Sequence, residues 1–446
     1  MTTPQPAGPV GPGGFPLAFL AVAMAASATV IDGVAMTLAL PAIAAYFDVP
    51  AGPAALVLTI PQLVMVALIL PLASLADRFG YRPVFLVSLC ISLPATVASI
   101  LSPDLGWLLA GRAVQAVGLA GLMSVNFALI RSIYPPQRIG RGVASLATTV
   151  GIATATGPAL AGLILSVASW HWVMAILLPL QLGAVVAGTL LLPPTPARGR
   201  GRTDVLAAAL SAVMMSALIL APVALTGGWH PLTALAALVV SALAFGLLRR
   251  RLRDDPEPLF PFDLFRIRAF VRALAASTAV FAAQFAAFVG LPFFFVQDLG
   301  LPPATQGLVF STWPAALALA APFYGRLADR ISARPLCLAS LGVLMAGLAA
   351  LALTPADAAP LDVAWRMAIC GLGFAGFQTP NNRLMIAVTP PERGGAAGGT
   401  MATARQMGRA LGVASAALLL TLPFGDPRAI LWLAFGFAGI AVLARS

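Results

Sequence analysis

Long apolar stretches, each about the length of a membrane-spanning helix, follow one another from residue 16 to the end of the chain. A helix needs about 20 mostly apolar residues to cross a bilayer. Charged residues, prolines and glycines separate the stretches, which predicts short connections. The pattern therefore predicts an all-α membrane protein with fourteen transmembrane helices, near residues 16–46, 54–76, 83–102, 105–130, 142–168, 172–192, 205–226, 231–248, 270–296, 304–325, 335–354, 361–382, 396–423 and 428–444.

Composition supports the same class and excludes several functions. Of the 446 residues, 60% are hydrophobic and 9% charged, and the mean hydropathy is +0.95, whereas about a quarter of the residues of a soluble domain are charged. Every basic residue is arginine, so a phosphate-binding P-loop with its lysine is absent and any transport must draw on an ion gradient or on a partner. Common catalytic and metal-binding motifs are also missing. We expect no enzyme activity, cofactor, metal site or nucleic-acid partner.

The arginines indicate the orientation, because short cytoplasmic loops carry the positive excess. Most of them fall in alternate loops, at Arg78, Arg82, Arg131, Arg138, Arg141, Arg198, Arg200, Arg202, several positions between 249 and 272, Arg326, Arg330, Arg334, Arg383, Arg393 and Arg445. The opposite loops hold Arg428 with Asp48, Asp104, Asp298, Asp357, Asp362 and Asp426. Both termini are therefore predicted to be cytoplasmic. This distribution fits twelve spans plus a non-spanning 205–248 hairpin equally well, but the length of the two apolar runs favours insertion.

The chain contains an internal repeat. Residues 73–82 read ASLADRFGYR and residues 325–334 read GRLADRISAR. Repeated halves with a site between them are a common transporter plan. We expect a six-helix bundle in residues 1–193, an inserted two-helix hairpin in 204–250 and a second six-helix bundle in 265–446. The repeated loops predict a cytoplasmic gate, in which the acids pair with arginines or cap a helix across the half-interface, formed by Asp77, Arg78, Arg82, Asp329, Arg330 and Arg334. The alternative is a solvated charge cluster.

These motifs resemble the major facilitator superfamily, in its fourteen-span branch of drug–proton antiporters. The segment from Asp32 to Pro41 is similar to the span-1 pattern of that branch, and Arg112 with Gln115 resembles the motif linked to proton coupling. Arg405 and Gln406 fit the span-13 pattern. The antiporter motif, which implies export, is carried by Gly151, Gly157, Pro158 and Gly162, with ordinary small-residue packing as the alternative.

Charges deep inside the spans are candidate functional groups. Asp32 lies about 24 Å of helix from Asp48, and Arg112 about 12 Å from Asp104. An ionised carboxylate in a low-dielectric site is costly, so Asp32 is the predicted proton site. A static hydrogen-bonded role is its alternative, and a pair with Arg112 is left open. Arg405 and Arg409 are expected to face a watery cavity or a bound anion, unless they snorkel to the surface.

The substrate remains open at this point. The resemblance implies lipophilic cations, whereas three embedded arginines, with Arg366 as a possible fourth, favour anionic or zwitterionic amphiphiles. The candidate cavity residues are Asp32, Asn126, Gln284, Trp313, Gln378, Arg405, Gln406 and Arg409. Hydrogen bonds between helices would explain Asn126, Gln284 and Gln378 equally well. Core or lipid-facing packing is the favoured interpretation of the stripe Phe281, Phe285 and Phe288. Helix packing is expected for two glycine groups: Gly371, Gly373 and Gly376, which spell a false nucleotide motif, and Gly394, Gly395, Gly398 and Gly399.

The leading hypothesis is a monomeric proton-coupled antiporter of the bacterial cytoplasmic membrane that exports amphipathic drugs or toxic compounds by alternating access. Its partners would be protons, small amphipathic substrates and the lipid bilayer. Export of an anionic or zwitterionic amphiphile or of an endogenous metabolite is one alternative, and proton-driven import of a nutrient is another. A non-transporting membrane receptor or scaffold is the alternative of a different class.

Overall fold

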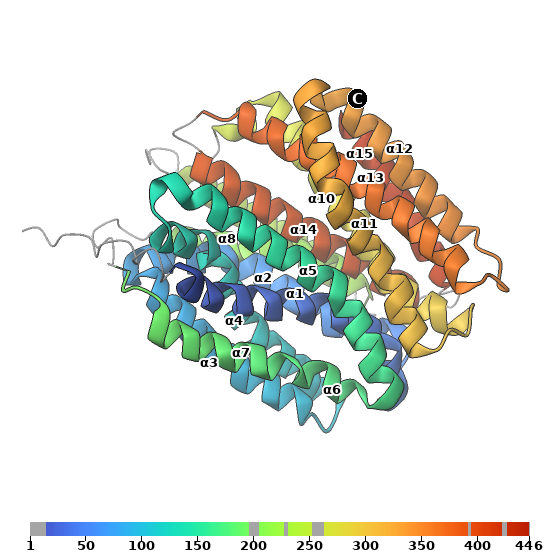
Figure 1. Cartoon of the computed structure of the whole chain (residues 1–446). Coiled ribbons are helices and arrows are strands. Elements are labelled where there is room, and N and C mark those ends of the chain that lie inside the picture. Colours follow the sequence, from blue (N-terminus) through green and yellow to red (C-terminus); the bar gives the residue numbers. More distant parts are fainter. Residues whose placement is uncertain are drawn as a thin grey trace, which may run out of the picture.

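The computed structural model describes residues 15–195, 205–226, 231–251, 263–390, 394–421 and 426–445. Long helices connected by short turns make up this part of the chain (Figure 1). The α-helices are α1 (Phe15–Tyr46), α2 (Ala51–Phe79), α3 (Tyr81–Ile100), α4 (Leu105–Ile133), α5 (Ile139–Val167), α6 (Trp170–Ala175), α7 (Leu177–Leu191), α8 (Val205–Thr226), α9 (Pro231–Arg251), α10 (Arg268–Gln297), α11 (Pro303–Arg330), α12 (Ala333–Ala352), α13 (Pro360–Ala387), α14 (Gly394–Thr421) and α15 (Pro427–Arg445). Two 3-10 turns, η1 (Pro136–Arg138) and η2 (Leu264–Arg266), precede α5 and α10.

Eleven helices in the described part of the chain are long and apolar enough to cross a membrane. One of them joins α6 and α7 across Ile176 into the single span Trp170–Leu191. The helices α8, α13 and α14 are not among the eleven, and α14 carries Arg405, Gln406 and Arg409. The all-helical membrane class is confirmed, whereas the full number of fourteen spans stays a prediction. Arg198, Arg200, Arg202 and Arg393 lie outside the described residues.

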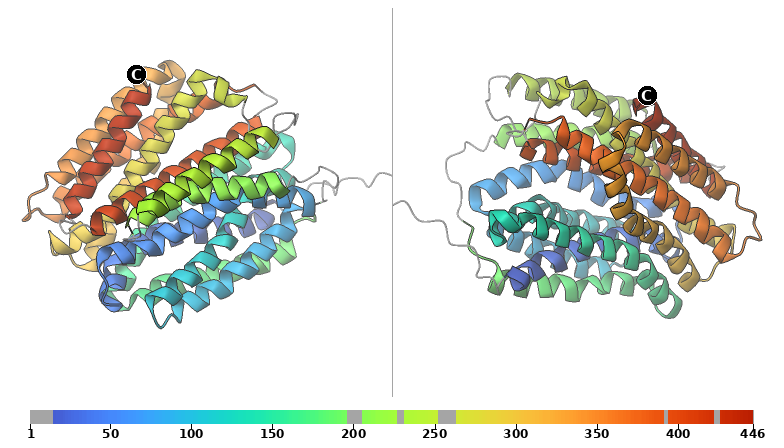
Figure 2. Two further views of the ribbon diagram at one scale, coloured as in Figure 1. Left: turned by 180° about the vertical axis from the view of Figure 1, so that it is seen from behind. Right: turned by 45° about the horizontal axis from the view of Figure 1, so that its top comes forward.

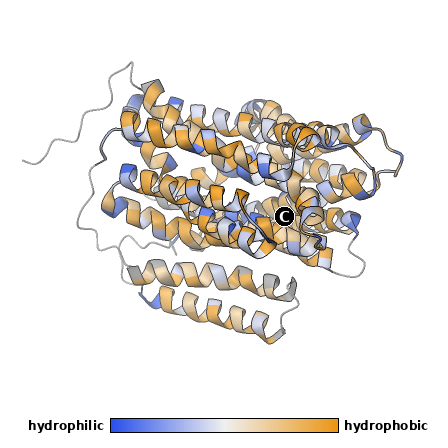
Figure 3. Ribbon diagram, turned by 90° about the horizontal axis from the view of Figure 1, so that it is seen from below, coloured by the Kyte–Doolittle hydropathy of each residue, from blue (hydrophilic) through white to orange (hydrophobic). Residues whose placement is uncertain are grey.

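The helices form two groups with a hairpin beside them. Helices α1 to α7 pack chiefly on one another, and so do α10 to α15. The hairpin α8–α9 packs against α2 of the first group and α14 of the second (Figure 2). Its contact is a small apolar cluster that contains Val66 of α2, Met214 and Met215 of α8, Leu248 of α9 and Ala410 of α14. Apolar residues cover most of the outward helix faces, and hydrophilic ones gather toward the helix ends (Figure 3).

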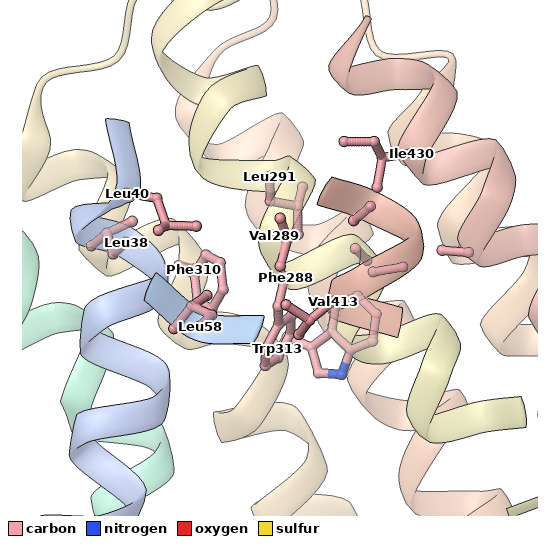
Figure 4. Packing of buried hydrophobic residues seen from close by; sticks show 14 of the residues in the cluster. Leu38, Leu40, Leu58, Phe288, Val289, Leu291, Phe310, Trp313, Val413 and Ile430 are labelled. Atoms are coloured by element: carbon pink, nitrogen blue, oxygen red, sulfur yellow. The ribbon is translucent and has the colours of Figure 1, made fainter. Parts of the chain in front are cut away.

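The two ends of the bundle are packed differently. We call the end that holds Arg78, Arg138 and Arg330 the arginine-rich end, and the end that holds Asp48 and Asp298 the acidic end. The largest core cluster includes both helix groups and extends in the second group as far as Cys337 and Ala441. The two groups meet in it toward the acidic end, where Leu38, Leu40 and Leu58 of the first group approach Phe288, Leu291, Phe310, Trp313, Val413 and Ile430 of the second (Figure 4).

Toward the arginine-rich end the groups have separate cores. The cluster around Phe85, Leu119 and Ile130 contains only residues of the first group, and the cluster around Phe270 and Met385 contains only residues of the second. The large core therefore joins the two groups at the acidic end, whereas toward the other end these two cores are separate and the groups meet where α2 packs on α14 beside the hairpin.

Close helix contacts at glycines explain part of this packing. A Cβ atom on Gly371, Gly373 or Gly376 would lie within 2.4 Å of an atom of α11 or α12, so the packing role expected for these glycines is confirmed. The same expectation was wrong for Gly398 and Gly399, where an added Cβ would meet nothing within 4 Å. Glycine spacing alone does not indicate which helix face has a neighbour.

Candidate functional site

Helix α4 positions the first candidate site. The Asp104 side chain caps the helix by accepting a hydrogen bond from the Trp107 backbone N–H at 2.8 Å, which satisfies one of the free N–H groups of the first turn. Arg112 and Gln115 follow on one face of α4, because residues three apart are neighbours on a helix. Both side chains are buried, and both point at Asp32 of α1.

Asp32 and Arg112 form a buried ion pair. The Arg112 guanidinium donates to Asp32 Oδ1 at 2.5 Å, and the two side chains are 1% and 4% exposed for arginine and aspartate. Arg112 also donates to Gln115 Oε1 at 2.7 Å and to the Val57 carbonyl oxygen of α2 at 3.3 Å. Gln115 Nε2 lies 3.3 Å from the same carboxylate oxygen. The predicted proton-coupling residues thus meet in one cluster, and the open question of an Asp32 and Arg112 pair is answered.

The polar cluster continues beyond the residues that we predicted. Gln115 Nε2 donates to the Thr96 hydroxyl of α3 at 3.0 Å, and Gln181 Nε2 of α7 donates to the same hydroxyl at 3.1 Å. Close packing makes these bonds possible, since a Cβ on Gly118 would lie 2.4 Å from the Ser88 carbonyl oxygen of α3. Nothing in the sequence distinguishes Thr96 from other threonines in spans. Gln181, in contrast, is a lone amide in an apolar run, which indicates a candidate polar contact inside the protein.

This geometry can couple protonation to helix packing. An ionised Asp32 holds Arg112 and Gln115 of α4, and through Arg112 it is linked to α2. A protonated Asp32 loses its charge and so loses most of its attraction for the guanidinium. Because the pair is almost fully enclosed, little solvent is present to compensate for that loss.

A second polar cluster lies on α14. Gln406 is buried and donates to Gln62 Oε1 of α2 at 2.5 Å, which links the two helix groups. Arg405 donates to Asn382 Oδ1 of α13 at 2.7 Å, and Arg409 donates to Gln406 Oε1 at 3.4 Å. The three α14 residues predicted for the cavity thus face other polar groups inside the protein.

The predicted aromatic stripe divides into two parts. Phe288 is packed in the large core, which agrees with the expected core packing, and its ring centroid lies 5.3 Å from that of Trp313. Trp313 was predicted for the cavity but is itself fully buried in this core, so a cavity role for it stays a prediction. Phe285 is only partly buried, and the Arg409 guanidinium lies over its ring at 5.0 Å. Both Arg405 and Arg409 lie over Phe281, at 5.8 and 5.5 Å. Core packing alone does not describe Phe281 and Phe285, because their rings also contact cations.

The other predicted cavity residues make no hydrogen bond to either polar cluster among the described residues. Asn126 Oδ1 on α4 is buried without a hydrogen-bond partner. Gln284 on α10 is 8% exposed, and Gln378 on α13 is partly buried. Arg366 donates to Asp362 one turn earlier at 2.7 Å, toward the acidic end. It is therefore compensated, which corrects its expected place as a fourth charge of the interior.

Four of the six predicted gate residues contact groups of their own half. Asp77 accepts a hydrogen bond from the Tyr81 hydroxyl at 2.7 Å, and Asp329 forms an ion pair with Arg383 of α13. Arg82 donates to the Thr189 carbonyl oxygen of α7 at 2.5 Å, and Arg78 lies over the ring of Phe79 at 5.2 Å. Arg330 and Arg334 end α11 and begin α12. These bonds do not cross between the halves in this conformation, so a gate role remains a prediction.

Part of the predicted antiporter motif forms the contact between α5 and α11. A Cβ on Gly162 would lie 2.5 Å from the Pro303 carbonyl oxygen, and a Cβ on Gly307 would lie 2.5 Å from the Pro158 carbonyl oxygen. Gly157 packs on Val34 of α1 within its own half, and Gly151 meets nothing within 4 Å. Gly162 and Pro158 therefore form a close seam between the two halves, whereas Gly157 and Gly151 do not.

Comparison with known proteins shows the family. Residues 17–413 match the Major Facilitator Superfamily. The chain belongs to this superfamily. It is 38% identical over 414 residues to the uncharacterized transporter YebQ of Escherichia coli, which covers 92% of this chain and 90% of the relative. As the family consists of transporters, these findings point to a multi-pass membrane transporter and away from an enzyme.

More distant relatives differ in what their names state. The chain is 28% identical to the riboflavin transporter RibZ of Clostridioides difficile, with 86% of this chain and 83% of the relative covered. It is 29% identical to the multidrug resistance protein Stp of Mycobacterium tuberculosis, with 86% and 72% covered. A peptide transporter POT crystallised with sulfate has the same fold, with a TM-score of 0.72, 15% identity and coverage of 97% and 93%.

Proposed function

We propose that this chain is a proton-coupled antiporter of the bacterial cytoplasmic membrane, which exports amphipathic small molecules by alternating access. It would act as a monomer with fourteen spans, cytoplasmic termini, two six-helix bundles and the hairpin α8–α9. The observation that carries the proposal is the buried pair of Asp32 and Arg112. An ionisable residue deep in a span is costly to bury and is therefore a candidate functional group. The pair can exist in two states, with Asp32 ionised or protonated, which differ by one proton.

Three observations support export over import. The motif around Gly162 resembles that of antiporters, and its seam with Gly307 closes the acidic end. One relative carries the name of a multidrug resistance protein. The separate cores at the arginine-rich end, which we assign to the cytoplasm from the arginine distribution, are those expected of an inward-facing state that accepts substrate from inside the cell.

In the proposed mechanism, protonation of Asp32 changes the packing of the helices around it. Protonation of Asp32 weakens its bond to Arg112, frees α1 relative to α4 and allows the halves to rearrange. Return of the ionised state restores the pair. If substrate binding favours one arrangement and the proton the other, the opposite fluxes are coupled.

Proton movement in proteoliposomes tests this proposal. The purified full-length protein is reconstituted with an internal pH dye, and ethidium and 2-naphthoate are added separately as cationic and anionic amphiphiles. We expect at least one of them to drive proton movement in the opposite direction in the wild type, and this movement to be lost in Asp32→Asn. Asp298→Asn is the matched control, because Asp298 also forms a half-buried ion pair, with Arg428 at 2.7 Å.

Two results would overturn the proposal. One is proton movement in the same direction as the substrate, which would indicate an importer. The other is the absence of any proton response to both probes in wild-type protein that melts cooperatively.

A further inference from the structure

Two partly buried arginines in the interior have no carboxylate partner among the described residues. Arg405 and Arg409 lie one turn apart on α14, and they donate hydrogen bonds to the uncharged amides Asn382 and Gln406. The Nε atoms of both arginines are buried without a hydrogen-bond partner. A buried cation whose N–H groups are unsatisfied is costly, and two like charges one turn apart repel each other.

The packing of α14 on α10 holds these charges in place. Cβ atoms on Gly408 and Gly412 would each lie 2.3 Å from a carbonyl oxygen of α10, at Thr278 and Ala282. The Thr278 hydroxyl also donates to the Ala404 carbonyl oxygen at 3.3 Å. Because the two backbones touch, neighbouring residues of α14 lie against the side chains of α10. This arrangement explains why both guanidinium groups lie over Phe281 and why Arg409 lies over Phe285.

Asp32 does not serve as a counter-ion for Arg405 and Arg409, because it is already paired with Arg112. Asp32 is the acid buried within a span in the described chain, and its Oδ1 atom is bonded to Arg112 and Gln115. The Asp32 and Arg112 charges cancel, whereas those of Arg405 and Arg409 add. The interior therefore carries an excess of positive charge beside two aromatic rings.

We propose that Arg405, Arg409 and Asn382 bind the anionic group of the exported substrate, and that Phe281 and Phe285 contact its planar apolar part. The ligand class is an organic anion with a carboxylate, sulfonate or phosphate attached to a flat ring. A fork of guanidinium N–H groups matches such an anion. This inference rests on the proposed export function and specifies its substrate class, which is opposite in charge to the cations implied by the family resemblance.

Binding to the purified full-length protein tests the inference without a proton gradient. The probes are 2-naphthoate and (2-naphthylmethyl)trimethylammonium, which share a ring system and differ in charge, and calorimetry measures their affinities. We expect wild-type protein to bind the naphthoate more tightly. Arg405→Gln and Arg409→Gln should each weaken it about tenfold or more, since charge-assisted hydrogen bonds are lost. Arg366→Gln is the matched control and should leave the affinity unchanged, because Arg366 is paired with Asp362.

Tighter binding of the ammonium compound to the wild type would overturn the inference. Equal naphthoate affinity in Arg409→Gln and wild type would do so as well. The wild-type comparison needs no variant, so it remains decisive if a substitution prevents folding. Naphthoate binding without any proton response in liposomes would retain this inference and reject the antiport, whereas proton exchange with ethidium without naphthoate binding would do the reverse.

Discussion

At the scale of single residues, the Asp32 cluster depends on charge balance inside an enclosed site. Removing one member of a buried ion pair leaves an uncompensated charge, which commonly costs about 3–5 kcal/mol. Removing both members leaves no such charge. The stability of the pair can therefore be separated from the stability of its surroundings by changing the residues singly and together.

We predict that Arg112→Gln lowers the free energy of unfolding by about 3 kcal/mol or more, and that adding Asp32→Asn recovers part of that loss. The single variant leaves the carboxylate buried without its cation, whereas the double variant replaces it with a neutral amide that still bonds Gln115. Unfolding of the wild type, both single variants and the double variant in detergent measures the coupling. Additive losses would contradict a direct interaction.

Sequence reasoning at this scale identified residues better than it identified their partners. Depth within apolar runs predicts that Asp32, Arg112, Arg405 and Arg409 are interior, and all four contact polar groups inside the protein. Depth along one helix does not give its rotation relative to another. For that reason the bond to Arg112 was left open, and Thr96, whose side chain is ordinary for a span, was missed.

At the scale of helices, the seam between α5 and α11 depends on two glycines at the acidic end. A Cβ on Gly162 would lie 2.5 Å from the Pro303 carbonyl oxygen and 2.8 Å from the Gly307 Cα atom. These neighbours are backbone atoms, which cannot turn aside as a flexible side chain can. A displacement of roughly an ångström is needed, because tightly packed interiors have little free space.

We predict that Gly162→Val opens the acidic end and reduces substrate accumulation several-fold, whereas Gly151→Val in the same helix has little effect. Gly151 has nothing within 4 Å of an added Cβ, which makes it a matched control with the same change in helix propensity. Distances between spin labels at Ser169 and Pro302 measure the opening. Equal distances in the two variants would show that the seam does not hold the end closed.

Membrane insertion of the hairpin α8–α9 decides between twelve and fourteen spans. We predict that Thr226→Cys, in a background with Cys90, Cys337 and Cys370 replaced by alanine, reacts with a membrane-impermeant thiol reagent from the outside of intact cells. Thr226 ends α8, so an inserted hairpin places it outside. Ser169→Cys, between α5 and α6, is the positive control. Reaction of Thr226→Cys only after cell lysis would indicate that the hairpin does not span the membrane.

Helix packing also explains why one prediction from the sequence was wrong. Gly371, Gly373 and Gly376 were correctly assigned to packing, whereas Gly398 and Gly399 were not. Both groups look alike as small residues in an apolar helix. The difference arises from which neighbours the fold brings to each face, and a single sequence contains no direct record of those neighbours.

At the scale of the whole molecule, the two halves share a core at the acidic end, meet midway along α2 and α14, and have separate cores toward the arginine-rich end. The shared core, the Gly162 and Gly307 seam and the bond between Gln62 and Gln406 link them. The internal repeat predicted two comparable halves, but it could not predict which conformation is populated. Alternating access requires that the Asp32 cluster, which lies within one half, changes the contact between both.

The central claim is that Asp32 couples proton movement to substrate movement, and substrate exchange separates coupling from transport. In proteoliposomes, exchange of labelled for unlabelled substrate needs no net proton transfer, whereas accumulation against a gradient does. With whichever of ethidium or 2-naphthoate the wild type transports, Asp32→Asn should keep exchange and lose accumulation driven by a pH gradient. Accumulation by Asp32→Asn equal to that of the wild type would contradict the account.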